Sequence, residues 1–218
     1  MKLVSFTCIQ VLYNDSSSME HHHLAAAFAL MKEDSCNFLQ HMPVRQKSEM
    51  RKMVIEAVMA TDMKQHFSLS SLFNTKFSST TETAVGHATV VRRSLMSSRD
   101  LSAGLDGELR SLVLQIAMKC ADLGALAAAR KVHVQWVQRL EEEFFRQGDQ
   151  EHRLSLQKSP LMDRSKDGLS KAQPQVSSRG LPEAKFFSMV ALPLFKSFVA
   201  IFPDCSPLLE NTNGNLDM

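Results

Sequence analysis

The chain has 218 residues, a formal net charge of +2, 44% hydrophobic residues and 22% charged residues. This length and balance are typical of one globular domain with a sizeable core, and the lack of a basic block excludes a nucleic-acid polymer as an expected partner. Glycine and proline are few, with 8 and 7 residues. Good helix formers dominate the periodic segments, so we expect an all-α fold built as a multi-helix bundle.

Apolar residues recur at helical spacing in several segments, and no segment alternates with period two. The spacing predicts helices over residues 20–32, 44–60, 108–120, 125–147 and 186–201. Gly148 is expected to end the fourth helix. The Ser/Thr-rich residues 77–83 are expected to form a loop, residues 165–185 a flexible insertion, and residues 204–218 a disordered tail that frays.

The four cysteines, at positions 8, 36, 120 and 205, contain no Cys-x-x-Cys pair. Wide spacing without a secretory leader favours reduced thiols and a cytoplasmic location. The apolar run 186–202 is interrupted by Pro193 and Lys196. It therefore predicts a buried core helix, and we expect no membrane span.

The first predicted helix opens with Glu20, His21, His22 and His23. Carboxylate and imidazole together suit zinc and similar ions, but adjacent helical residues point about 100° apart. Only Glu20 and His23 share a face. The alternative interpretation is that Glu20 simply favours the positive end of the helix.

Two aspartates are further candidates. Asp122 follows the apolar run 112–121, where a carboxylate is costly unless a cation or hydrogen bonds compensate it. The alternative is that Asp122 caps the next helix, which is a common role of aspartate. Asp62 is either a second such carboxylate or an ordinary residue at a helix end.

Several motifs occur in a fixed order along the chain. In that order they resemble the catalytic domain of class I 3′,5′-cyclic-nucleotide phosphodiesterases, over residues 11–164 and again over 186–203. On this resemblance, residues 11–203 form a partial catalytic domain and residues 1–10 an atypical start. The motifs are Tyr13-Asn14-Asp15, Glu20 with His22-His23-Leu24, Ala60-Thr61-Asp62-Met63, Lys119-Cys120-Ala121-Asp122-Leu123, Trp136, Glu142-Glu143-Phe144-Phe145-Arg146-Gln147-Gly148-Asp149 and Ser159-Pro160-Leu161-Met162-Asp163-Arg164.

The resemblance implies hydrolysis of cAMP, cGMP or both to 5′-monophosphates by two divalent metal ions, zinc together with magnesium or manganese. The ions would activate a bridging water as the attacking hydroxide. Asp122 would be a direct metal ligand. Glu20, His23 and Asp62 would hold waters of the metal centre.

The resemblance also implies a pocket for the base of the cyclic nucleotide. Gln173 would bond the purine edge and Phe186 would stack on its face, with the inserted residues 174–185 between them. An ungapped register would instead place Glu183 at the glutamine position, and a carboxylate cannot donate the amide hydrogen bonds. The further pocket residues would be Leu123, Met63, Trp136, Leu140 and Phe144, whose alternative interpretation is plain core packing.

The family's general-acid His, its other metal-binding His residues and its His-Asp pair precede the Tyr-Asn-Asp motif, so we expect them upstream of this chain. We therefore expect the isolated chain to have little or no activity. Two alternatives stay open. One is a non-catalytic helical interaction module that self-associates through uncovered apolar surface. The other is an unrelated helical metalloprotein centred on residues 20–23.

Overall fold

The computed structural model describes residues 8–78, 106–159, 161–165 and 186–216. The chain divides into two units, one comprising Ser5–Asp122 and the other containing Leu123–Met218. Every element in the described residues is a helix, which confirms the all-α prediction. The prediction of a loop at 77–83 is wrong for Phe77 and Ser78, which belong to a helix. Residues 79–83 and most of the predicted insertion, 166–185, lie outside the described residues.

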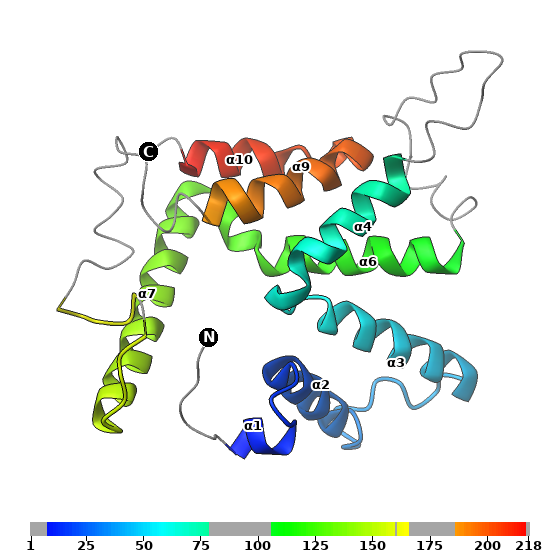
Figure 1. Ribbon diagram of the computed structural model, residues 1–218. Helices are drawn as coiled ribbons and strands as arrows, with labels where there is room; N and C mark the ends of the chain where they lie inside the picture. Colours follow the sequence, from blue (N-terminus) through cyan, green and yellow to red (C-terminus); the bar gives the residue numbers. More distant parts are fainter. Residues whose placement is uncertain (1–7, 79–105, 160, 166–185, 217–218) are drawn as a thin grey trace, which may run out of the picture. The chain divides into compact units, whose positions relative to one another are not determined.

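Helix α6 is the centre of the first unit. Helices α3 and α4 both pack on α6, α2 packs on α3, and α1 packs on α2 (Figure 1). Helix α4 was not predicted from the sequence. The elements of this unit are α1 (Cys8–Leu12), α2 (Ser18–Leu30), α3 (Val44–Met59), the 3₁₀ turn η1 (Met63–Gln65), α4 (His66–Ser78) and α6 (Gly107–Asp122).

The core of the first unit is built on one stripe of α6. Leu112, Ile116 and Cys120 are spaced by four residues and are all buried, as expected for the inner face of an amphipathic helix. Ala57 from α3 and Phe73 from α4 are buried as well. The same periodicity carries Lys119 into the interior beside Cys120.

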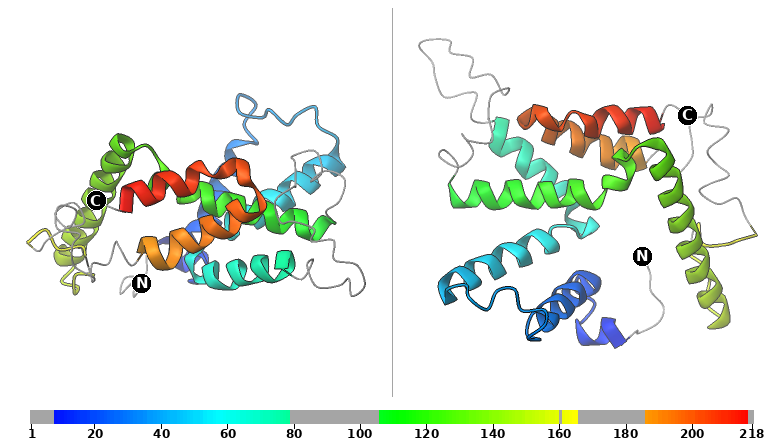
Figure 2. Two further views of the ribbon diagram at one scale, coloured as in Figure 1. Left: turned by 90° about the horizontal axis from the view of Figure 1, so that it is seen from above. Right: turned by 180° about the vertical axis from the view of Figure 1, so that it is seen from behind.

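In the second unit, α9 and α10 lie side by side, and α10 also contacts η3 and α7 (Figures 1 and 2). Leu194, Phe195 and Phe198 of α9 are buried, which confirms the predicted core helix near the end of the chain. None of the described helices is both long enough and apolar enough to cross a bilayer. The elements are η3 (Gly124–Ala127), α7 (Arg130–Arg153), the π-helical turn η5 (Phe187–Ala191), α9 (Leu192–Ile201), η6 (Pro203–Cys205) and α10 (Pro207–Leu216).

Gly148 does not end a helix, so that prediction was wrong. Helix α7 continues through it to Arg153, and Gly148 is buried. A Cβ atom at this position would lie 1.8 Å from the carbonyl oxygen of Met162. The backbone at Met162 approaches the helix so closely that only glycine fits at this position.

The prediction of a disordered tail was also wrong for most of residues 204–218. Residues Pro207–Leu216 form α10. The side-chain amide of Asn211 donates to the carbonyl of Ala127 at 3.0 Å, and that of Asn215 donates to Leu126 and Ala128 at 2.9 Å each. These two asparagines donate to carbonyls of the 3₁₀ turn η3 and of the residue after it. The polar side chains that suggested disorder therefore hold α10 in place.

Candidate functional site

Asp62 is a buried carboxylate at the turn after α3, with an exposed fraction of 8%. It caps the 3₁₀ turn η1 by accepting a 2.8 Å hydrogen bond from the backbone N–H of Lys64. Its other oxygen accepts a 2.8 Å hydrogen bond from the hydroxyl of Ser17. Asp62 is therefore a helix-end residue, as one of the two sequence interpretations had it. Two short hydrogen bonds hold its carboxylate.

The charge state of Asp62 follows from these contacts. Burial raises the pKa of Asp62, but the hydrogen bonds from Lys64 and Ser17 and the positive charges of Lys64 and Lys119 outweigh it. The net result is a pKa below the ordinary value of aspartate, so the group is ionised at neutral pH.

Lys119 is the most deeply buried charged side chain near this turn, with an exposed fraction of 2%. Its Nζ donates to the carbonyl oxygen of Ala60 at 2.8 Å and lies 3.5 Å from those of Thr61 and Asp62. These carbonyls follow directly on the last residue of α3. A cation is favourable at this end of a helix, where carbonyls without intrahelical partners carry partial negative charge.

Three carboxylates act electrostatically on Lys119. Burial lowers the pKa of Lys119, while the negative charges of Asp122, Asp62 and Glu20 raise it, and the pKa stays below the ordinary value of lysine. We call Glu20, Asp62 and Asp122 the acidic cluster. Its members come from the start of α2, the turn after α3 and the end of α6, so three separate segments deliver negative charge to one buried cation.

The structure gives Asp122 and two of the histidines other surroundings than the sequence predicted. Asp122 is the last residue of α6 and is exposed, and η3 begins after Leu123 without a side-chain cap, so the capping alternative for Asp122 is not supported. His23 is also exposed. The ring of His21 instead stacks on Tyr13 at 5.8 Å between centroids.

The donor set does not fit a pair of metal ions. Within the described ranges, no three His, Cys, Asp or Glu side chains are arranged so that they could hold a metal ion. The carboxylates of the acidic cluster instead raise the pKa of Lys119. Of the three carboxylates, that of Asp62 is held in place by hydrogen bonds, from Ser17 and Lys64.

A second polar network follows α7. The guanidinium of Arg164 donates to both carboxylate oxygens of Glu142, at 2.7 and 3.0 Å, and to Asp149 at 2.9 Å. Lys158 pairs with Asp163 at 2.8 Å. These bonds hold the pKa of Glu142 and that of Asp163 at about 2. The motif 159–164 therefore fastens the chain against α7.

A sequence model described as 3′5′-cyclic nucleotide phosphodiesterase matches residues 5–212. The chain belongs to this family. The match agrees with the resemblance predicted from the ordered motifs and extends it at both ends.

Among curated proteins, the chain is similar to the rat and mouse 3′,5′-cyclic-AMP phosphodiesterases 4C, with 32% and 31% identity. It is also 32% identical to a probable 3′,5′-cyclic-AMP phosphodiesterase, pde-4, of Caenorhabditis elegans. Each alignment covers 95% of this chain but only 34%, 27% and 27% of these relatives, in that order. The chain thus spans about a third or less of their lengths.

The fold has a solved counterpart. The phosphodiesterase domain of the RhoPDE fusion protein from the choanoflagellate Salpingoeca rosetta superposes with a TM-score of 0.76 at 23% identity. The superposition covers 97% of this chain and 58% of that one. At this identity the comparison establishes the shared fold.

The residues predicted to form the phosphodiesterase pocket are divided between the two units. Met63 belongs to the first unit, while Leu123, Phe144 and Phe186 belong to the second. Gln173 and Glu183 lie outside the described residues. Each unit therefore carries part of the predicted set.

Trp136 and Leu140 are not core residues of the described chain. About half of each side chain is exposed, at 50% and 45%, whereas Val137 beside them is buried. The guanidinium of Arg139 lies 5.4 Å from the centre of the Trp136 ring. The core-packing alternative is thus unsupported at these two positions.

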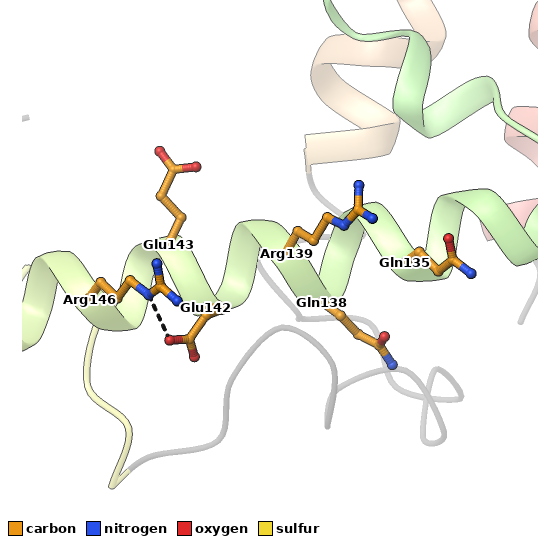
Figure 3. A pocket seen from close by; sticks show the side chains of 6 residues that line it. All are labelled: Gln135, Gln138, Arg139, Glu142, Glu143 and Arg146. Carbon is orange, nitrogen blue, oxygen red and sulfur yellow. Dashed lines mark hydrogen bonds and ion pairs between the residues drawn. The ribbon is translucent and has the colours of Figure 1, made fainter.

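A hollow on the surface of α7 is lined by other residues than those predicted to form the phosphodiesterase pocket. Its lining side chains all come from that one helix, and an ion pair of 2.9 Å joins Arg146 to Glu142 across it (Figure 3). The lining residues are Gln135, Gln138, Arg139, Glu142, Glu143 and Arg146. None of them is a predicted site residue, and a surface formed by one helix offers no wall on which a base could be enclosed.

Sequence reasoning missed Lys119 and Ser17 as members of the site. Lys119 had a detectable signal, because it stands on the stripe side of α6 next to buried Cys120 and three residues after buried Ile116. A lysine is almost never fully buried unless it is paired. Ser17 directly precedes the first residue of α2, a position typical of polar side chains that bond near a helix start.

Proposed function

We propose that this chain serves the hydrolysis of 3′,5′-cyclic nucleotides as part of a phosphodiesterase catalytic domain, with cAMP as its substrate. The family match over residues 5–212 and the relatives named for cAMP support the reaction class and the base. The observation that carries the proposal is the family match, which includes Glu20, Asp62 and Asp122, the three carboxylates that act on Lys119.

We also propose that residues 1–218 alone hydrolyse cyclic nucleotides slowly or not at all. Family members, as the resemblance implies, use two divalent ions to activate the attacking hydroxide. The described residues do not supply the donors for such a pair. Both carboxylate oxygens of Asp62 already accept a hydrogen bond, from Ser17 and from Lys64. A metal ion would have to compete with these bonds for the carboxylate.

The experiment is a hydrolysis assay with the purified chain, in which cAMP and cGMP are supplied separately and zinc and magnesium are added. We expect a turnover below about 0.1 per second, against roughly 1–1000 per second for typical enzymes, with more product from cAMP than from cGMP. A cGMP rate above the cAMP rate would contradict the assignment of the substrate.

We propose a cytoplasmic location. Cys36 and Cys205 are free thiols. Cys36 is exposed, so an oxidising compartment would leave it open to disulfide formation. Labelling of Cys36 by a thiol reagent in intact cells would support the reducing compartment, and its protection by a disulfide would count against it.

A second candidate function is a non-catalytic helical interaction module. The specific observation is an apolar row on α7, formed by Val132, Trp136 and Leu140, which are spaced by four residues and are each 44–50% exposed. Neighbours at this spacing lie on one side of a helix. Light scattering over a range of concentrations tests this candidate: association that is lost in Trp136→Ser would support it, and a monomer throughout would count against it.

A further inference from the structure

We infer that three side chains of the second unit, His133, Asn211 and Asn215, are positioning residues of the proposed nucleotide site. They hold the segment of residues 123–128, which begins with the predicted pocket residue Leu123. The inference rests on the proposed function, because Leu123 matters here as part of the pocket for the base. Its first readout needs no nucleotide, so its failure and the failure of the proposed hydrolysis can be told apart.

Four consecutive carbonyls, those of residues 125–128, each meet a side-chain nitrogen. Nδ1 of His133 lies 3.0 Å from the first carbonyl oxygen, and since a carbonyl only accepts, this nitrogen carries the hydrogen. The amide of Asn211 donates to the third carbonyl at 3.0 Å. The amide of Asn215 donates to the second and the fourth at 2.9 Å each. We call this set of four bonds the carbonyl clamp.

The segment depends on these donors because it is too short to be stable by itself. The turn η3 has four residues, Gly124–Ala127, and a helix of this length is not stable by local bonds alone. Carbonyls at the end of a helix also lack partners inside it, and Ala127 is only 9% exposed, so an unpaired carbonyl there would be costly. The carbonyl clamp supplies the missing donors from the two helices α7 and α10, which both contact η3.

The carbonyl clamp reaches Leu123 through the backbone. The amide of Leu126 donates to the carbonyl of Leu123 at 3.0 Å, so Leu123 belongs to the turn that the clamp holds. His133 lies on α7 with an exposed fraction of 2%, and the same helix carries the predicted pocket residues Trp136 and Leu140. The bond from His133 therefore fixes one part of the predicted pocket relative to another.

The first readout is hydrogen exchange of the Leu126 amide in the full chain, because that amide closes the turn on Leu123. His133→Leu removes the donor, whereas His133→Asn keeps a side-chain N–H near the position of Nδ1. We expect exchange about 10-fold faster in His133→Leu and less than about 3-fold faster in His133→Asn. The amide of Phe198, a buried residue of α9, should keep its rate. Equal acceleration at Phe198, or no rescue by His133→Asn, would overturn the inference.

The second readout separates positioning from stability alone. Trp136 is the only tryptophan of the chain, so energy transfer from it to mant-cAMP, a fluorescent cAMP analogue, reports binding near α7. We expect His133→Leu to weaken this binding about 5–10-fold and His133→Asn to leave it within about 2-fold. Faster local exchange with unchanged binding would overturn the inference. If the wild type binds no mant-cAMP, the proposed substrate is wrong, and the exchange readout decides the inference.

A second variant, Asn211→Ala, decides the inference if His133→Leu does not fold. It removes one bond of the carbonyl clamp from an exposed position of α10, and Asn213→Ala, also at an exposed position of α10, is its matched control. We expect the Leu126 amide to exchange about 3–10-fold faster in Asn211→Ala and at the wild-type rate in Asn213→Ala. The same rate in both variants would overturn the inference.

Discussion

The hydroxyl of Ser17 donates a 2.8 Å hydrogen bond to Oδ2 of Asp62 and joins the start of α2 to the turn after α3. The two residues are 45 positions apart in the sequence. The bond therefore fixes the segment that carries Glu20 relative to the segment that carries Asp62. Two members of the acidic cluster depend on it for their relative positions.

Ser17→Ala removes this bond from an ionised acceptor. Hydrogen bonds to charged groups contribute about 1.5–3 kcal/mol, and the pair is only part-buried, so we expect a loss of roughly 1–2 kcal/mol. Urea unfolding measures the change, and Ser16→Ala at the exposed neighbouring position is the control. Equal stability of the two variants would show that the bond does not hold α2 in place.

Gly148→Ala should be strongly destabilising. The added Cβ would lie 1.8 Å from the carbonyl oxygen of Met162, so the returning chain must separate from α7, and we expect a loss of about 2–4 kcal/mol. Gly214→Ala in α10 is the matched control, because a Cβ atom added there would meet nothing within 4 Å. Alanine at that position should stabilise by about 0.5–1 kcal/mol. Opposite signs in thermal melts would confirm this interpretation of both glycines.

Asn215→Ala should loosen the C-terminal helix. It removes two 2.9 Å hydrogen bonds to the carbonyls of Leu126 and Ala128, and the loss should be about 1–2 kcal/mol. Hydrogen exchange of the α10 amides is the measurement, and it should accelerate there more than in α7. Asn213→Ala, at an exposed position of the same helix, should leave the exchange rates unchanged. Equal acceleration in both variants would mean that the amide bonds of Asn215 are not what holds α10.

Much of this architecture could be predicted from local pattern. Leu112 and Ile116 recur at helical spacing and are buried in α6 as expected. The features that were missed depend on partners distant in the sequence. Lys119 bonds carbonyls 57–59 positions away, and the asparagines of α10 bond carbonyls 84–89 positions away. Periodicity reports which face is buried, but it does not report which polar group meets which.

The same distinction applies to the candidate site. The ordered motifs identified Glu20, Asp62 and Asp122 by resemblance, and all three carboxylates act electrostatically on Lys119. The role of Lys119 was not predicted, because the local pattern can mark it as buried but cannot show that it reaches the carbonyls after α3. Gly148 was misinterpreted for a similar reason, since Met162 approaches it only after the chain turns back.

The network around Arg164 predicts a defined response to acid. The pKa of Glu142 and that of Asp163 are each about 2 in the folded chain, below their ordinary values of 4.5 and 3.8. A lowered folded pKa contributes stability above the unfolded value, and this is lost as pH falls through the folded value. We therefore expect the melting temperature to fall between about pH 4.5 and pH 2.

Arg164→Gln isolates the part of this response that belongs to Glu142. The variant lacks the guanidinium that lowers the pKa of Glu142, so its melting temperature should be below the wild type at pH 6 and should approach it at pH 2. Arg153→Gln, which removes an exposed arginine near the end of the same helix, is the control and should leave the pH profile unchanged. A constant difference between Arg164→Gln and the wild type at all pH values would contradict the assignment.

The most direct measurement of the central claim is the number of divalent ions bound by the purified chain. Equilibrium dialysis against zinc and manganese, followed by elemental analysis, should give the same ion content for the wild type and Asp122→Asn, because the described residues hold no group of three His, Cys, Asp or Glu side chains that could bind an ion. Two ions per chain that disappear in Asp122→Asn would contradict the account and would show that these residues build a metal centre after all.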